Sequence, residues 1–121
     1  DDCIMAQQVR RVITRFVGAV AERNFKNETV KLCTHITPDV LEEMAVRKTR
    51  VADLIEKSGH EFPAYRPNPF VDYLMSRTDA QLLDTLEPVL PHHVEVLRRH
   101  PDFCADFIRD LKRLAGMAAQ G

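Results

Sequence analysis

The sequence predicts an all-α fold: an irregular or orthogonal bundle of about five to six helices with one proline-rich extended segment. Apolar residues recur at spacings of three and four along most of the chain, which is the period of an amphipathic helix. No stretch shows the alternation of apolar and polar residues that a half-buried strand requires. With 121 residues the chain fits a single helical domain, residues 1–121, because a chain of this length builds one core.

Residues 4–25 are predicted to form the first helix, and we expect its broad apolar stripe to pack inside the domain. Gly18 lies in the middle of this helix, where glycine costs about 1 kcal/mol relative to alanine. A close approach by a neighbouring helix would explain a glycine there. Asn27 predicts the cap of a second, short helix over residues 28–36. The stripe of the first helix consists of Met5, Val9, Val12, Ile13, Phe16, Val17 and Val20.

The run Thr37-Pro38-Asp39 is the strongest helix start in the chain. Its threonine can cap free amides, its proline needs no partner at the first helical position, and its aspartate suits the positive end of the helix dipole. The pattern predicts one helix over residues 38–58 that ends at Gly59, although Lys48 interrupts its apolar stripe. That stripe consists of Leu41, Met44, Val51, Leu54 and Ile55, and Glu43 with Arg47 is expected to form an exposed ion pair.

Residues 61–69 are predicted to be extended, because Pro63, Pro67 and Pro69 each push the preceding residue away from helical geometry. The dipeptide Asn68-Pro69 then indicates the start of a short helix.

Three further helices are predicted in the last third of the chain. Thr78 and Gln81 have the spacing of a capping box, and Pro91 begins a helix that reaches residue 100. Residues 101–118 show the clearest helical pattern, with acidic residues early and basic residues late. The core stripe of this last helix is expected to contain Phe103, Cys104, Phe107, Ile108, Leu111, Leu114, Ala115 and Ala118.

Neither sign of charge dominates, because 17 basic and 18 acidic residues give a net charge of −1. This balance gives no bulk attraction for nucleic acid or for a membrane surface. No apolar run approaches the ~18 to 20 residues of a membrane span. The three cysteines are odd in number and widely spaced, which is untypical of a disulfide framework. We therefore expect reduced thiols in an intracellular compartment, either the cytoplasm or an organelle matrix if a targeting segment has been removed.

Metal binding and catalysis have little support. His92, His93 and His100 lie near Cys104, but the paired ligand spacings of zinc sites are absent. Catalysis by Cys104 would need a neighbouring base, and a thiol on a core stripe is inert. We expect no metal, no cofactor and no enzymatic activity.

Acidic residues recur along the last predicted helix at Asp102, Asp106 and Asp110. A buried carboxylate pair could perform acid–base chemistry. Asp106 and Asp110 instead neighbour Arg109 and Arg113, so we expect solvated ion pairs on the polar side of the helix.

Clusters of basic residues raise the alternative of a small nucleic-acid-associated regulator. Residues 49–59 resemble the first half of a helix-turn-helix, but the position of its turn glycine holds Glu56, and proline follows where the recognition helix should begin. This alternative requires the arginines of the first helix and those of residues 47–50 to share one face. The clusters are Arg10-Arg11 with Arg15, Arg47-Lys48 with Arg50, Arg98-Arg99, and Lys112-Arg113.

The leading hypothesis is a non-catalytic protein–protein interaction module, or an accessory or structural subunit of a larger assembly. Its partner would be another protein or a second copy of the chain. The proline-rich segment either docks on that partner or straps its own helices, and both remain open. The first helix is a second candidate, because a terminal helix can pack on a partner. The predicted partner-binding residues are Phe62, Tyr65, Arg66 and Phe70 in the segment and Arg11 and Arg15 in the first helix.

Overall fold

The computed structural model describes the backbone of residues 2–118 and the side chains of residues 3–118. This part of the chain is all-helical and contains seven α-helices and no strand, so the predicted class is confirmed with one or two more helices than expected. The helices are α1 (Asp2–Cys33), α2 (Pro38–Arg47), α3 (Val51–Lys57), α4 (Pro69–Ser76), α5 (Asp79–Leu86), α6 (Pro91–Arg99) and α7 (Pro101–Ala118).

The first helix is longer than the sequence predicts. A single helix of 32 residues, α1, replaces the two helices expected on either side of Asn27. Ala21, Phe25 and Thr29 follow one another at spacings of four and are all fully or nearly fully buried. The cap signal of Asn27 is overridden because a break there would separate Phe25 from Thr29, whose hydroxyl donates to the Phe25 carbonyl at 2.6 Å.

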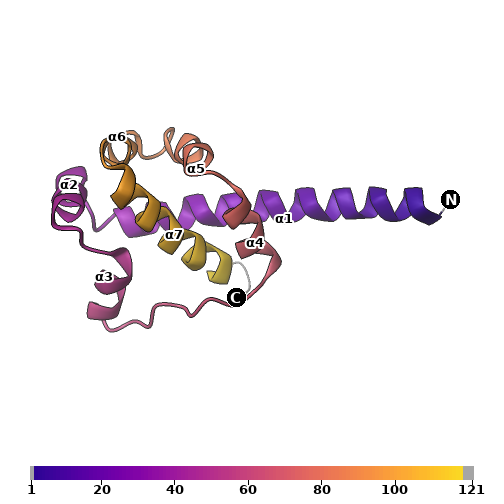
Figure 1. Ribbon diagram of the computed structural model, residues 1–121, viewed down its shortest axis with the longest axis horizontal. Coiled ribbons are helices and arrows are strands. Elements are labelled where there is room, and N and C mark those ends of the chain that lie inside the picture. Colours follow the sequence, from indigo (N-terminus) through magenta and orange to yellow (C-terminus); the bar gives the residue numbers. More distant parts are fainter. Residues whose placement is uncertain (1, 119–121) are drawn as a thin grey trace.

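The other helices gather around the second half of α1, while its first half extends away from them (Figure 1). The second half packs mainly against α4 and α7, and α5 also contacts it. We call residues 3–17 of α1 the arm and the rest of the described chain the body.

Two glycines allow α4 to fit between α1 and α7. A Cβ atom added to Gly18 would lie 2.9 Å from Cε2 of Tyr73, which confirms the predicted close approach of another helix. A Cβ atom on Gly116 of α7 would overlap the side chain of Val71. The body is therefore held together by small residues as well as by large ones.

The predicted helix over residues 38–58 is divided into α2 and α3. Lys48 adopts the left-handed conformation with φ of 58°, and its backbone N–H bonds the carbonyls at the end of α2. This turn brings Val51 into the core, where it is fully buried, and places Arg50 beside Asp110 of α7. Tertiary contacts thus override a continuous helical pattern that no glycine interrupts.

Apart from the cap at Asn27, the local start signals in the sequence are confirmed. Thr37 caps α2, Asn68 caps α4, and Thr78 with Gln81 forms the capping box of α5. The helices beginning at Pro91 and Pro101 also start where predicted. These signals work because each depends on contacts within a single turn.

The polar side of α7 differs from the prediction. Asp106 pairs with Arg109 at 3.0 Å in solvent, as expected. Asp110, predicted to be solvated, is instead only 1% exposed and accepts a hydrogen bond from Arg50 at 2.9 Å. Lys112 is buried as well and donates to the Arg77 carbonyl at 3.0 Å, and desolvation lowers the pKa of its ammonium group. The core stripe of α7 is as predicted around Cys104, Phe107, Ile108, Leu111 and Ala115.

Candidate functional site

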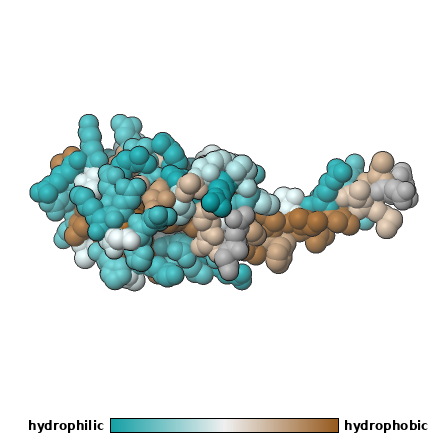
Figure 2. Space-filling model, turned by 90° about the horizontal axis from the view of Figure 1, so that it is seen from below, coloured by the Kyte–Doolittle hydropathy of each residue, from teal (hydrophilic) through white to brown (hydrophobic). Residues whose placement is uncertain are grey.

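Large apolar side chains are exposed along one side of the arm. We call these residues the arm stripe. They were predicted to lie in the core, and that prediction is wrong, because each of them is 55% exposed or more. Figure 2 shows the hydrophobic surface running along the arm beyond the body. The arm stripe consists of Met5 (64% exposed), Val9 (56%), Val12 (66%), Ile13 (55%) and Phe16 (66%).

The arm stripe faces away from the body because the two halves of α1 use different sides of the helix. An α-helix turns by roughly 100° per residue. With this rotation, the arm stripe lies nearly opposite the side that carries Gly18, Ala21 and Phe25, which contact the rest of the body. The large residues of the arm therefore cannot reach the core by simple extension of the packed face.

The spacing along the arm stripe is that of a paired helix. Met5, Val9, Val12 and Phe16 are separated by four, three and four residues, which is the heptad spacing of a coiled-coil seam. A shallow groove of about 280 Å³ lies among Met5, Gln8, Val9, Val12 and Ile13. Residues at i, i+3, i+4 and i+7 form the four-residue hole that accepts a side chain from a facing helix.

The charged residues of the arm lie away from the arm stripe. Arg10 and Arg11 are exposed on the far side of the helix, and Arg15 is exposed at its flank. Residues 3–21 contain no acidic residue. Of the predicted partner-binding residues, Arg11 and Arg15 thus belong to the arm but not to its apolar side.

The proline-rich segment, residues 60–68, lies outside the helices. The guanidinium of Arg113 stacks 4.1 Å from the centre of the Phe62 ring and donates to the Pro63 carbonyl. At the other end of the segment, Phe70 packs against the core. Both ends are thus attached to the body, while Tyr65 remains 53% exposed and Arg66 is exposed too.

The predicted partner-binding residues form two separate groups. Tyr65 and Arg66 belong to a segment that runs along the body, whereas Arg11 and Arg15 lie on the projecting arm (Figure 1). The apolar stripe of the first helix was predicted to pack inside the domain, with docking on a partner as the second possibility.

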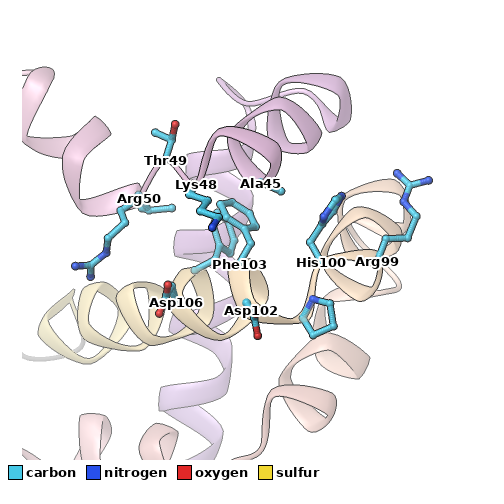
Figure 3. A pocket seen from close by; sticks show the side chains of 12 residues that line it. Ala45, Lys48, Thr49, Arg50, Arg99, His100, Asp102, Phe103 and Asp106 are labelled. Carbon is cyan, nitrogen blue, oxygen red and sulfur yellow. The ribbon is translucent and has the colours of Figure 1, made fainter.

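A pocket of about 380 Å³ lies between the α2–α3 turn and the α6–α7 junction (Figure 3). Arg50 and Arg99 point away from one another at its two ends. Glu42, next to the pocket, accepts from His100 at 2.9 Å and from Arg99 at 3.0 Å. The hydrogen bond from His100, together with Arg99, holds the pKa of the Glu42 carboxyl below its ordinary value.

Titratable side chains line the pocket, namely Lys48, His100, Asp102 and Asp106. Among the described residues that line it, Thr49 carries the only hydroxyl group, and none is a cysteine. The charges of Arg50 and Arg99 are already balanced by Asp110 and Glu42, so they are committed to structural pairs.

The two buried thiols and His93 also serve structural contacts. Cys33 and Cys104 are buried, and desolvation raises the pKa of each to about 11, which keeps both thiols protonated. His93 donates from Nε2 to the Ile36 carbonyl at 2.5 Å. Within residues 3–118, no three His, Cys, Asp or Glu side chains gather in a way that could hold a metal ion.

No known protein family, no curated protein and no solved structure matches this chain. Over the part of the chain that the structure describes, no helix is both long and apolar enough to cross a membrane.

Proposed function

We propose that the chain is a non-catalytic protein–protein interaction module, acting as an accessory or structural subunit of a larger assembly, and that it docks through the arm stripe. The observation that carries this proposal is the row of large apolar side chains exposed side by side on the arm, which the body does not cover. Contiguous apolar patches on a monomer typically mark interaction sites, whereas single exposed apolar residues do not.

The energetics of the arm support a partner. An isolated helix as short as the arm is only marginally stable in water. Burial of each half-exposed side chain of the arm stripe would contribute roughly 1 kcal/mol. A partner that covers all of them would gain several kcal/mol and would order the arm at the same time.

The proline-rich segment is proposed as a second, smaller contact. Its attached ends hold Phe62 and Phe70 in the body, and its exposed middle presents Tyr65 and Arg66, residue types that are enriched at interface hot spots. The segment loses little entropy on docking because both of its ends are already attached.

No observation favours the nucleic-acid alternative. The arginines of the arm lie at one end of the molecule, whereas α2 and α3 with Arg47 and Arg50 lie at the other (Figure 1). Arg47 pairs with Glu43 at 2.7 Å, which the sequence predicted, and Arg50 pairs with buried Asp110.

The proposed function is tested by site-specific photo-crosslinking in the native cell. A photoreactive residue at Val9 faces the partner, whereas one at Gln7 on the other side of the arm is the matched control. We expect strong cross-linking to a protein from position 9 and weak cross-linking from position 7. Equal yields from the two positions, or none from either, would overturn the proposal.

Alanine at Tyr65 and Arg66 tests the second contact. This double variant should weaken partner capture without changing helicity by circular dichroism, because both side chains are exposed. Undiminished capture would remove the segment from the interface and leave the arm as the docking surface.

A further inference from the structure

We infer that the occupant of the arm stripe is the arm of a second copy of this chain, running antiparallel to the first. The inference rests on the proposed function and names its partner. The arm stripe carries both a groove and the side chains to fill it, its seam is free of charge, and its area suffices for a dimer.

The groove and the seam are self-complementary when two arms run antiparallel. In this alignment Val12 of the second copy faces Val9 and enters the groove that Met5, Gln8, Val9 and Val12 surround. Phe16 of the second copy then faces Met5, and a thioether beside an aromatic ring is a favourable contact. Because the pair is two-fold symmetric, each of these contacts occurs twice, and every seam residue has a counterpart in the other copy.

The distribution of charge permits this pairing. Residues 3–20 place no charged side chain on the seam, so no like charges face each other directly across it, and the arginines of each arm lie off the seam. Arg15 lies at the flank on the same side as Gln8, and the antiparallel alignment sets Arg15 of one copy beside the Gln8 amide of the other. Arg10 and Arg11 stay in water on the outer side of the pair.

Charge also selects the antiparallel direction. If the seam is continued along α1, its next positions are Ala19 and Arg23, and Arg23 is exposed. A parallel pair would bring the two Arg23 side chains together and would set Phe16 against Phe16. An antiparallel pair separates the arginines and matches the largest seam residue with flexible Met5.

The expected interface is large enough for a stable pair. Ten half-exposed apolar side chains from two arms bring together roughly 1,000 Å² of surface, about the lower bound for a specific interface. The body packs on the side of α1 nearly opposite the arm stripe, so the two bodies do not compete with the facing arm for space.

Sedimentation equilibrium of the purified full chain tests the pairing. We expect a dimer at micromolar concentration. Val12→Asp should weaken the dimer by about 100-fold or more, because it places carboxylates at the centre of the seam. Gln7→Asp, which adds the same charge on the other side of the arm, should change the affinity by less than about threefold. Both variants keep the body intact, since each site is exposed in the arm.

Disulfide trapping tests the direction. In a Cys3→Ser background, Met5→Cys and Phe16→Cys chains are oxidised separately and as a mixture. Antiparallel pairing predicts a mixed disulfide between the two variants and little linkage of either alone. Two copies of residue 5 would lie about 16 Å apart along the helices, beyond the reach of a disulfide. Efficient linkage of Met5→Cys to itself would show parallel pairing and overturn the inference.

A monomeric wild-type chain at all micromolar concentrations would also overturn the inference. If the monomer co-sediments with vesicles containing anionic phospholipid, the arm stripe binds a lipid surface and not a second copy of the chain. If photo-crosslinking from Val9 in the cell persists while the purified chain stays monomeric, the proposed function stands with a different protein as partner. Loss of both signals would overturn both proposals.

Discussion

The two halves of α1 carry their apolar residues on opposite sides of one helix, and only those of the second half are buried. The second half presents Gly18, Ala21, Phe25 and Thr29 to the body and is tightly packed there. The first half presents larger and more apolar residues, yet the body covers none of them. The difference teaches that the strength of an apolar stripe does not identify the core. Contact with a neighbouring helix depends on close approach, and in α1 small residues provide it.

The two halves also differ in their polar contacts. In the second half, Tyr73 of α4 donates to Glu22 at 2.9 Å, and Arg77 lies 3.8 Å from the same carboxylate. Desolvation and the Glu22 carboxylate raise the pKa of the Tyr73 hydroxyl. Over the arm, Thr14 bonds the Arg10 carbonyl within its own helix. The body is thus specified by contacts between helices, whereas we propose that the arm is completed by a partner.

The largest expected effect is on the free energy of unfolding, and it distinguishes two phenylalanines on α1. Phe25→Ala should lower the free energy of unfolding by about 3–5 kcal/mol, because it leaves a cavity in the core. Phe16→Ala should change it by less than about 0.5 kcal/mol, because its side chain is exposed in the single chain. Urea unfolding in a Val12→Asp background, which removes pairing of the arms, measures both. Comparable losses would mean that the arm packs on the body.

A comparison of two arginines comes next. Arg50→Ala should cost about 2 kcal/mol, since it leaves the buried Asp110 carboxylate unpaired; the cost stays below that of a fully buried pair because Arg50 is half-exposed. Arg11→Ala on the arm should be nearly neutral. Thermal unfolding measures the pair of variants. A neutral Arg50→Ala would show that the Asp110 charge is balanced without this contact.

The three thiols also differ between the arm and the body in their accessibility to reagents. A thiol reagent near neutral pH should modify exposed Cys3 of the arm quickly and Cys33 and Cys104 only on unfolding. The folded-state pKa of each buried thiol, about 11, lies above the ordinary value of 9.0. The folded protein therefore keeps protons that the unfolded chain loses, and stability should decline as the pH rises from 9.0 towards 11. Rapid labelling of Cys104 in the folded protein would contradict the burial of α7.

The smallest expected effect is at acid pH and is confined to the body. The folded-state pKa of Glu42 lies below the ordinary value of 4.5, so its contribution to stability is present above pH 4.5 and is lost as the pH falls through the lowered value. Glu42→Gln should flatten the pH dependence of the melting temperature in this range. An unchanged profile would show that the pairs with His100 and Arg99 add nothing to folding.

The sequence predicted most parts of the fold whose signals are local, and the cap at Asn27 is the exception. The capping box at Thr78 and the helix from Pro101 needed only neighbouring residues, and both are confirmed. The division at Lys48 was not predictable, because a lysine in the left-handed conformation depends on the docking of Val51 and the contact of Arg50 with Asp110. Propensity within the segment alone favours a continuous helix.

The arm shows why the candidate site was harder to predict than the fold. The sequence identified both the apolar stripe and the close approach at Gly18, but the stripe was assigned to the core. Gly18 already lay on the other side of the helix from Phe16, and that geometry indicates which side meets the body. The assignments of Tyr65 and Arg66 to a partner remain proposals.

Hydrogen–deuterium exchange of the arm amides tests the central claim most directly, because it reports whether the arm stripe is covered. At a concentration where the dimer forms, residues 3–17 should be protected in the wild type and in Gln7→Asp. In Val12→Asp these amides should exchange rapidly, while the second half of α1 stays protected in all three proteins. Rapid exchange of the arm in the wild type, equal to that in Val12→Asp, would contradict the account.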